Sequence, residues 1–268
     1  MKEDKLKKLR DILLDMGRVV VAYSGGVDST FLLRVSRDTL GKENVLAVIA
    51  VSPTYPSWEW KEAVRRCEEM DVDYQVIHTE EWKDENFLSN PPERCYYCKK
   101  ELFHKLRKIA EEQGNFRVVE ASNVDDLKDF RPGMKAKEEM GVRSPLIEAG
   151  FTKKEIREYS RQLSLPTWNK PSFACLSSRI PYGERITREK VERIEKGEKF
   201  LKDIGFPQVR VRVHGEIARI EVEREYLERL LKERERVVNF FRALGFIYVT
   251  LDLEGYRSGS MNLLLSQK

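Results

Sequence analysis

Six consecutive residues, Ser24-Gly25-Gly26-Val27-Asp28-Ser29, constrain the fold of this chain more than any other feature. The apolar run before them, residues 18–23, is typical of a buried parallel strand, and residues 29–35 after them are typical of a helix. A strand, a glycine turn and a helix N-terminus make an anion site, because glycines let backbone N–H groups turn inward and the helix adds its unpaired N–H groups and positive dipole end. Ser24 and Ser29 add hydroxyl donors, and Asp28 is suited to orient a Mg²⁺ that arrives with a phosphate.

This loop lacks the Gly-Lys-Ser/Thr ending of a Walker A motif. It resembles the pyrophosphate loop of the PP-loop ATP pyrophosphatases, which cleave ATP to AMP and pyrophosphate and thereby adenylate a carbonyl oxygen. The resemblance implies that Ser24, Gly25, Gly26, Val27, Asp28 and Ser29 bind the nucleotide. The alternative interpretation is an ordinary strand-to-helix turn of an α/β domain.

The first part of the chain alternates strand and helix patterns. A leading helix is expected over residues 3–16, strands over 18–23, 44–51, 73–79 and 116–121, and helices over 28–39, 57–70 and 99–113. Residues 80–94 and 122–143 are expected to be irregular, and a capping box at Thr152 and Glu155 predicts a helix to about Leu163. The pattern predicts an α/β fold with a doubly wound parallel sheet, of PP-loop ATP pyrophosphatase type, over residues 1–170.

Beyond a proline-containing segment at 166–181 the pattern changes to a smaller α+β domain, expected over residues 171–268. A helix is expected over 187–203, a hairpin of strands 208–214 and 216–222 at His214-Gly215, a helix over 224–243 and a strand over 246–253. Apolar and charged residues alternate in the hairpin, which predicts a sheet with one solvated face.

Composition narrows the functional classes. The 268 residues carry a net charge of +4, with Lys and Arg spread along the chain, so a dedicated nucleic-acid module is not expected. The charged N-terminus lacks the apolar core of a signal peptide, and no apolar run is long enough to span a membrane, which predicts a cytoplasmic protein. In that compartment, the four cysteines are expected to be reduced, metal-bound or catalytic.

Three of these cysteines form a candidate site, whereas Cys67 is interpreted as a core or surface residue. Cys95 and Cys98 form a Cys-x-x-Cys pair at the start of a helix, and Cys175 lies in a separate segment. The residues alone leave four interpretations open: structural zinc, which needs a fourth ligand, a redox pair, a [4Fe–4S] cluster with three thiolate ligands and one open iron, or three unrelated thiols.

Several longer segments resemble the LarE family of ATP-dependent sulfur transferases, which help to build the nickel-pincer nucleotide cofactor. They are NPPERCYYCK at 90–99, NVDD at 123–126 with RPG at 131–133, PSFACLSSR at 171–179 and LDLEGYRSGS at 251–260. The resemblance extends from about residue 18 to residue 262. It implies that Cys175 is the sulfur site, which some members of the family sacrifice to dehydroalanine. It also implies that Cys95, Cys98 and Cys175 hold a [4Fe–4S] cluster carrying an extra sulfide, as in members with three cysteines.

The resemblance further implies the substrates and the reaction. ATP with Mg²⁺ would adenylate a carboxylate of a pyridinium dicarboxylate mononucleotide, and sulfide or another sulfur donor would then give a thiocarboxylate. Asp125 and Asp126 follow the fourth expected strand and are candidates to place Mg²⁺ or the ribose, or they form an ordinary acidic turn. Catalytic roles are expected for Cys175 and Asp28, and a homo-oligomer is expected.

Four arginines are candidates to bind the phosphate or the second carboxylate of this substrate: Arg179, Arg210, Arg212 and Arg257. Arg210 and Arg212 are two residues apart and so share one face of a strand, although a solvated face paired to Glu221 and Glu223 explains them equally well. Alternative functions are a PP-loop enzyme of tRNA 2-thiolation, an amidating synthetase of the NAD or GMP type, and a non-catalytic iron–sulfur or nucleotide-binding regulator.

Overall fold

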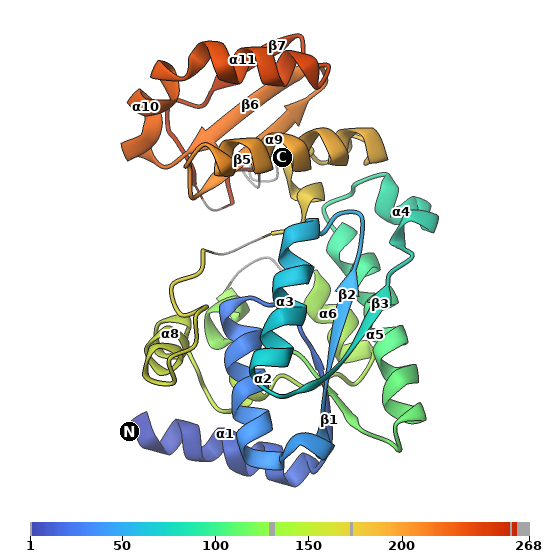
Figure 1. Cartoon of the computed structure of the whole chain (residues 1–268). Helices are drawn as coiled ribbons and strands as arrows, with labels where there is room; N and C mark the ends of the chain where they lie inside the picture. The colour runs from blue at the N-terminus through green and yellow to red at the C-terminus, as the bar shows by residue number, and fades with distance from the viewer. Residues whose placement is uncertain (1, 129–131, 172–173, 258, 262–268) are drawn as a thin grey trace. The chain divides into compact units, whose positions relative to one another are not determined.

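The chain forms two compact units in the computed structural model, which describes residues 2–128, 132–171, 174–257 and 259–261 (Figure 1). The first unit comprises Met1–Asp84 and Glu93–Phe173, and the second comprises Glu85–Pro92 and Ala174–Lys268. Arg131, Ser172, Phe173 and Ser258, which belong to the motifs noted above, lie outside the described residues. The expected domain boundary at 170/171 stays a prediction.

A four-stranded parallel sheet forms the centre of the first unit, in the order β3-β2-β1-β4. Its strands are β1 (Val19–Ala22), β2 (Val45–Val51), β3 (Asp73–His78) and β4 (Arg117–Val119). The three pairings are all parallel, for example Val19 beside Val45 and Val19 beside Arg117. The predicted fold class, an α/β fold of PP-loop ATP pyrophosphatase type with a smaller C-terminal α+β part, is confirmed.

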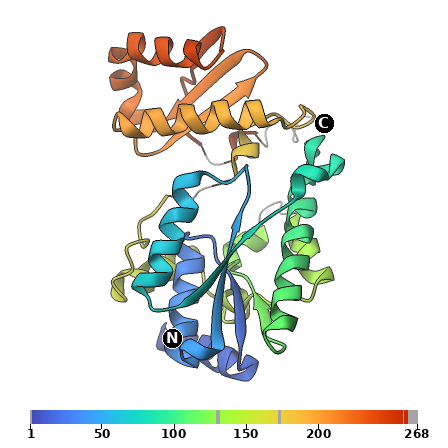
Figure 2. The ribbon, with the colours of Figure 1, turned by 45° about the vertical axis from the view of Figure 1, so that its right-hand side comes forward.

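Helices cover both faces of this sheet because its central strand is apolar on both sides (Figure 2). Val19 and Val21 pack with the helices of one face, whereas Val20 packs into the core of the other. The first face carries α1 (Lys2–Met16), α2 (Val27–Leu40), α3 (Ser57–Glu69) and α8 (Lys153–Gln162). The opposite face carries α5 (Arg94–Glu112) and α6 (Gly133–Glu139). The predicted capping box of α8 at Thr152 and Glu155 is present.

Two segments of the first part of the chain that were expected to be irregular contain helices. Segment 80–94 holds a 3₁₀ turn and α4 (Glu85–Leu88), and α5 begins at Arg94 instead of residue 99. Pro91 and Pro92 precede the N-cap residue Glu93. A helix cannot extend backward through them, because proline has no backbone N–H to donate and its ring clashes with the preceding turn. Segment 122–143 holds α6. Short 3₁₀ or α turns complete the unit: η1 (Lys42–Asn44), η2 (Glu81–Lys83), η3 (Val124–Lys128) and α7 (Pro145–Glu148).

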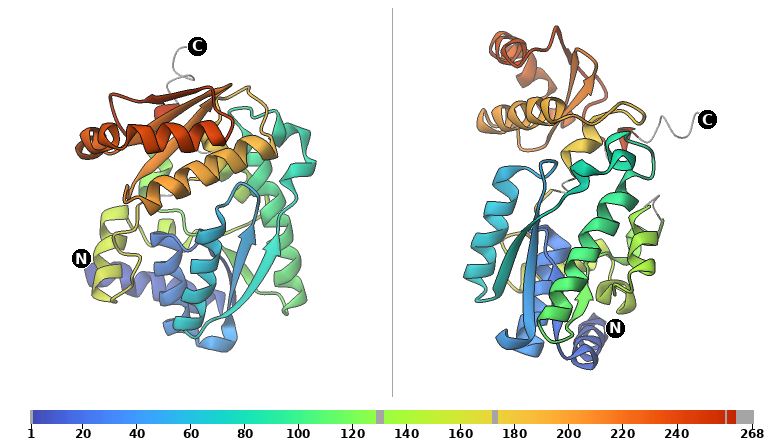
Figure 3. Two further views of the ribbon diagram at one scale, coloured as in Figure 1. Left: turned by 45° about the horizontal axis from the view of Figure 1, so that its top comes forward. Right: turned by 90° about the vertical axis from the view of Figure 1, so that its right-hand side faces the viewer.

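The second unit has a mixed three-stranded sheet in the order β5-β6-β7. The predicted hairpin is present, with β5 (Val209–His214) antiparallel to β6 (Ile217–Val222), while β7 (Tyr248–Leu251) is parallel to β6. The helices α9 (Arg188–Asp203) and α11 (Arg234–Ala243) lie on one face of this sheet (Figure 3), where Phe200 and Phe240 stack with ring centroids 3.9 Å apart.

Two predictions for the second unit were wrong, one of them only in part. The other face of the sheet is covered at β5 and solvated at β7: Arg210 and Arg212 are 4% and 5% exposed and Glu221 is fully buried, whereas Tyr248 on the same face is 62% exposed. The helix expected over 224–243 is divided into η5 (Arg224–Tyr226), α10 (Leu227–Lys232) and α11. Arg229 of α10 donates hydrogen bonds to the Ile204 and Gly205 carbonyls at the end of α9, which fixes α10 through a contact distant in sequence. Residues 176–179 form a further 3₁₀ turn, η4 (Leu176–Arg179).

Candidate active site

The segment Ser24–Ser29, called here the phosphate loop, lies at the carboxyl edge of the parallel sheet and runs from the turn after β1 into the first turn of α2. Strands β2 and β3 lie on one side of β1, and β4 lies on the other, so the strand order reverses next to β1. Open α/β sheets bind ligands at such a switch point. The loop that follows β4, with Asp125 and Asp126, therefore lies on the same edge as the phosphate loop.

The carbonyl oxygens of the loop are held by donors from elsewhere in the first unit. The Tyr55 hydroxyl donates to the Ser24 carbonyl at 2.5 Å, and the Lys170 ammonium donates to the Gly25 carbonyl at 3.2 Å. Lys170 is itself paired with the buried Glu59, at 2.5 Å. Because a planar trans peptide holds its C=O and N–H on opposite sides, these contacts turn the Gly25 and Gly26 N–H groups away from Tyr55 and Lys170.

The start of α2 is suited to an anion. Gly26 is the N-cap residue and no side chain caps the first turn, so the N–H groups of that turn and the positive end of the helix dipole are not neutralised by a side-chain cap. Ser24 and Ser29 share a hydrogen bond of 3.0 Å between their hydroxyls, which brings both donors to this position. Nucleotide binding by these residues stays a prediction.

Gly25 is required by both backbone conformation and packing. Its φ is +64°, in the left-handed region that favours glycine. A Cβ at this position would meet the Ala63 Cβ of α3 at 3.0 Å. The loop therefore packs directly against α3.

The Asp28 carboxylate is paired on one oxygen only. Its Oδ2 accepts a hydrogen bond from the Lys153 ammonium at 2.6 Å, while its Oδ1 is buried and has no hydrogen-bond partner among the residues that the structure describes. Burial raises the pKa of Asp28, the Lys153 charge opposes the rise, and the nearby Asp126 adds to it. An unpartnered carboxylate oxygen beside a second carboxylate is the donor set that Mg²⁺ prefers.

Asp125 and Asp126 also have structural contacts in their own turn. The Asp126 carboxylate accepts from the Asn123 N–H, and the Asp125 carboxylate accepts from the Lys153 N–H, each at 2.9 Å. Asp125 and Asp126 thus form an acidic turn that is also linked to the phosphate loop, because Lys153 contacts both Asp125 and Asp28.

Sequence reasoning missed Lys153, Lys170 and Tyr55. One signal for Lys153 was available: a lysine at the first position of a helix lies at the positive end of the helix dipole, where a cation is unfavourable unless a carboxylate compensates it. Lys170 and Tyr55 carry no comparable local signal, because their contacts with the loop span 145 and 31 residues of sequence.

The Cys-x-x-Cys pair lies in the first turn of α5, in the first unit. Cys95 is exposed and Cys98 is partly exposed, and three residues of spacing place both on one side of the helix. A Cβ on Gly133, the first residue of α6, would meet Lys99 at 3.0 Å and the Cys95 carbonyl at 3.5 Å, so glycine allows α6 to approach this turn closely. Cys67 is fully buried in the core, and burial raises the pKa of its thiol to about 12.

Cys175 belongs to the second unit and is partly exposed. It immediately precedes η4, and its sulfur lies 3.0 Å from the hydroxyl of the buried Ser177. The Arg179 side chain is fully buried and donates to the Ala174 and Cys175 carbonyls, at 2.6 and 3.0 Å.

The other three candidate arginines also lie in the second unit. Arg212 forms a bidentate pair with Glu221, at 3.0 and 2.9 Å. The Arg210 guanidinium lies 5.0 Å from the centroid of the Tyr256 ring, and burial together with the Arg179 charge lowers the pKa of Arg210 to about 10. Arg257 pairs with Glu254, and its buried Nε has no hydrogen-bond partner.

Over the residues that the structure describes, no group of three or more His, Cys, Asp or Glu side chains is placed to hold a metal ion. Mg²⁺ does not require such a group, because it is commonly held by one or two carboxylates together with substrate phosphates. Cys95 and Cys98 belong to the first unit and Cys175 to the second, and their binding of one cluster stays a prediction. Among the described helices, none combines the length and the apolar character needed to cross a membrane.

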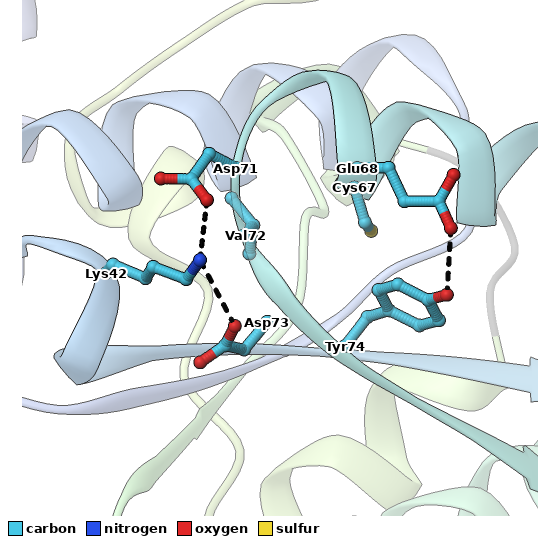
Figure 4. A pocket seen from close by; sticks show the side chains of 7 residues that line it. All are labelled: Lys42, Cys67, Glu68, Asp71, Val72, Asp73 and Tyr74. Carbon is cyan, nitrogen blue, oxygen red and sulfur yellow. Dashed lines mark hydrogen bonds and ion pairs between the residues drawn. The ribbon is translucent and has the colours of Figure 1, made fainter.

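A pocket of about 390 Å³ lies away from the phosphate loop, at the amino end of β3 (Figure 4). Within it the Lys42 ammonium lies 2.5 Å from Asp71 and 3.7 Å from Asp73, and the Tyr74 hydroxyl donates to Glu68. These side chains satisfy one another, and the pocket lies at the sheet edge opposite to the one where ligands bind in parallel sheets. We therefore assign it no part in the site.

The chain is similar to several known proteins. A family model described as NAD synthase matches residues 5–93. The chain is 42% identical over 269 residues to the uncharacterized protein slr1717 of Synechocystis sp., and the alignment covers 100% of both chains. It is 40% identical over 255 residues to the pyridinium-3,5-bisthiocarboxylic acid mononucleotide synthase of Lactiplantibacillus plantarum, covering 95% of this chain and 92% of that protein. It is 33% identical over 258 residues to the uncharacterized protein MJ0830 of Methanocaldococcus jannaschii, covering 95% and 98%.

Proposed function

The chain belongs to the LarE family of PP-loop enzymes, and we propose that it adenylates a carboxylate of a pyridinium dicarboxylate mononucleotide and installs sulfur there. It is thus an ATP-dependent sulfurtransferase. The observation that carries the proposal is the Asp28 carboxylate, which lies in an uncapped helix N-terminus with one buried oxygen unpartnered. Cytoplasmic location and homo-oligomeric assembly stay predictions.

The phosphate loop would bind ATP through its N–H groups and hydroxyls. Ser24, Gly25, Gly26, Val27 and Ser29 would contact the pyrophosphate portion, and Asp28 with Asp125 or Asp126 would place Mg²⁺ or the ribose. When bound, Mg²⁺ would offset the charge on the departing pyrophosphate. Lys153 pairs with Asp28 and would supply a second cation close to the phosphates.

A carboxylate resists attack by a nucleophile because direct displacement would require oxide as the leaving group. Adenylation replaces oxide by AMP as the leaving group. A carboxylate oxygen attacks the α-phosphorus of ATP, the bond to the β-phosphate breaks, and pyrophosphate leaves. A sulfur nucleophile then attacks the activated carbon, and AMP departs with the original carboxylate oxygen. The product is a thiocarboxylate, and the overall sequence involves no change in oxidation state at that carbon.

For the sulfur source, we propose Cys95, Cys98 and Cys175 as ligands of a [4Fe–4S] cluster. Their support is the donor chemistry: three thiols, of which two are adjacent on one helix turn and all are at least partly exposed. Such a cluster, held by three thiolates, would supply an open iron able to bind a replaceable sulfide. Ser177 would hold the Cys175 sulfur through their 3.0 Å contact.

Arg210 and Arg257 remain the proposed ligands of the substrate phosphate or its second carboxylate, whereas the donors of Arg212 are engaged by Glu221, the Ser178 carbonyl and the Ser260 hydroxyl. Burial and the Arg179 charge lower the pKa of Arg210, and a substrate anion beside this guanidinium would offset both effects. Arg257 has an unpartnered buried Nε. Guanidinium groups suit both anions because their planar forks match carboxylates and phosphates.

The test is the fate of ATP. With the pyridinium dicarboxylate mononucleotide, Mg²⁺ and sulfide, phosphorus NMR should show AMP and pyrophosphate. Asp28→Asn should reduce their formation by roughly 10²- to 10³-fold, the loss typical of one preorganised electrostatic group, with the circular dichroism spectrum unchanged. Formation of ADP and phosphate would contradict the proposal.

The same reaction separates the alternatives. A tRNA 2-thiolation enzyme would release pyrophosphate with unmodified tRNA and not with the mononucleotide. An amidating synthetase would respond to ammonia in place of sulfide, and a non-catalytic regulator would bind ATP without turnover. Each substrate is therefore offered alone, with the Asp28→Asn variant as the control for background hydrolysis.

A further inference from the structure

Arg179 has every direction of its guanidinium engaged by the protein. Its Nε and Nη2 donate to the two carboxylate oxygens of Glu198, at 2.8 and 2.9 Å. Its Nη1 lies within hydrogen-bond distance of the Ala174 carbonyl, the Cys175 carbonyl and the Ser178 hydroxyl, at 2.6, 3.0 and 2.9 Å. The side chain is fully buried, so a substrate anion would have to displace these partners to reach it.

Glu198 holds this guanidinium in place from α9. Its side chain is also fully buried, and its Oε1 accepts a second hydrogen bond, at 3.0 Å, from the Val211 N–H of β5. Burial raises the pKa of Glu198, but the charge and hydrogen bonds of Arg179, with the Arg210 charge and the Val211 N–H, together outweigh burial and lower the pKa. The pair is therefore ionic and is anchored to two elements of the second unit.

A second pair holds the other end of the same segment. Arg212 donates to the Ser178 carbonyl at 3.0 Å while its remaining donors form the bidentate pair with Glu221. The main chain of residues 174–178, which carries Cys175, is thus held by guanidinium groups on both sides of the thiol.

We propose that Arg179, fixed by Glu198, is a positioning residue that sets the backbone of the Cys175 segment, and not a ligand of the substrate. The inference rests on the proposed function, which makes Cys175 a sulfur-site residue. Its physical basis is that the carbonyl groups on either side of the Cys175 Cα–Cβ bond receive donors from one rigid fork, which fixes the direction in which the thiol leaves the chain.

Cysteine alkylation tests this in the whole chain, without substrate and after chelation of any bound metal. Arg179→Met should free the segment, so that iodoacetamide modifies Cys175 roughly tenfold faster or more, as for a locally opened region. The buried Cys67 reports global unfolding and should stay unmodified, while Cys95 should react at its original rate. The matched control is Arg185→Met, which removes an exposed bidentate pair with Glu85 in the same unit and should leave Cys175 unchanged.

An unchanged Cys175 rate in Arg179→Met, with Cys67 protected, would overturn the proposal. If Arg179→Met exposes Cys67, Glu198→Gln decides, because it keeps the side-chain shape and removes only the charge. That variant should still accelerate Cys175 modification with Cys67 protected, and an unchanged rate would equally overturn the proposal.

Kinetics distinguish positioning from substrate binding. In Glu198→Gln the KM for the mononucleotide should stay within about twofold and pyrophosphate formation should persist, while thiocarboxylate formation falls roughly tenfold or more. A KM raised about tenfold with unchanged Cys175 alkylation would identify Arg179 as a substrate ligand. A wild-type protein that releases no pyrophosphate would contradict the proposed function, while the alkylation rates would still decide the positioning role.

Discussion

The Lys153 ammonium lies 2.6 Å from Asp28 Oδ2 and joins two segments that are 125 residues apart in the sequence. Its backbone N–H also donates to Asp125, so one residue connects the phosphate loop to the acidic turn after β4. A lysine ammonium binds carboxylates and phosphates alike as a point charge. When ATP and Mg²⁺ bind beside Asp28, we expect the Lys153 ammonium to donate its hydrogen bonds to the phosphates instead of to Asp28.

Lys153→Met should therefore weaken ATP binding and slow pyrophosphate formation by about tenfold or more, since loss of one partner of a hydrogen-bonded charge pair is costly. The control is Lys154→Met, which removes the adjacent exposed lysine from the same helix turn and should behave as wild type. Steady-state pyrophosphate assays over a range of ATP concentrations make the comparison. Equal activity of the two variants would show that Lys153 has no part in the reaction.

Asp28 should make the folded protein less stable at neutral pH. Its pKa is raised in the folded state, mainly by burial, so the ionised form is disfavoured there relative to the unfolded chain. The cost is complete above the folded-state pKa and vanishes below the unfolded value of about 3.9.

Asp28→Asn should consequently have a higher Tm than wild type at pH 7, and the difference should narrow as the pH falls and disappear near pH 3 to 4, where aspartate is protonated even when unfolded. Thermal unfolding of both proteins at each pH measures it. A wild-type protein that is more stable than the variant at pH 7 would contradict the sign of this effect.

Most of the fold could be predicted because the signals are local. The run of valines at 19–21 is apolar on both strand faces, and Thr152 with Glu155 marks a helix start in four residues. The start of α5 at Arg94 was not predicted, because its first turn follows two prolines and lacks the regularly spaced apolar residues that mark a helix. The break before α11 depends on Arg229 and the end of α9, which are distant in sequence.

In the candidate site, too, the residues with local sequence signals could be predicted and those with contacts distant in sequence could not. Asp125 and Asp126 could be placed beside the phosphate loop, because parallel strands bring their carboxyl ends to one edge. Lys170 could not be placed there, since its contact with Gly25 spans 145 residues. The burial of Arg210 and Arg212 was missed because alternation of apolar and charged residues normally marks a solvated face, whereas here the β5 part of that face is covered and Arg212 is paired with Glu221.

Gly25→Ala should lower the free energy of unfolding of the first unit by more than the cost of the strained backbone alone. The left-handed conformation alone costs an alanine about 1–2 kcal/mol, and the added Cβ would also meet Ala63 at 3.0 Å. Gly17→Ala is the matched control, because Gly17 has a φ of +70° and no atom within 4 Å of the added Cβ.

Adding Ala63→Gly to Gly25→Ala should recover part of the loss, so denaturant unfolding of the four proteins in a double-mutant cycle should give a favourable coupling energy. A zero coupling energy would show that the loop does not depend on its contact with α3.

The cysteines predict the metal content. Anaerobically prepared protein should contain one oxygen-sensitive [4Fe–4S] cluster per chain, with broad visible absorbance and matching iron and sulfide counts. Cys95→Ala, Cys98→Ala and Cys175→Ala should each lose it, because two thiolates seldom retain such a cluster. Cys67→Ala should keep it, since that thiol is fully buried in the core. Stoichiometric zinc without iron would contradict this assignment.

The most direct measurement of the central claim follows ATP and sulfur in one reaction. Wild-type protein is supplied with the pyridinium dicarboxylate mononucleotide, ATP, Mg²⁺ and sulfide, and AMP, pyrophosphate and thiocarboxylate are quantified together with the intact mass of the chain. We expect the three products in equal amounts, several per chain, and Cys175 unchanged in mass. AMP without thiocarboxylate would contradict sulfur transfer, and loss of hydrogen sulfide from Cys175, matched one-to-one with product, would contradict the replaceable sulfur source.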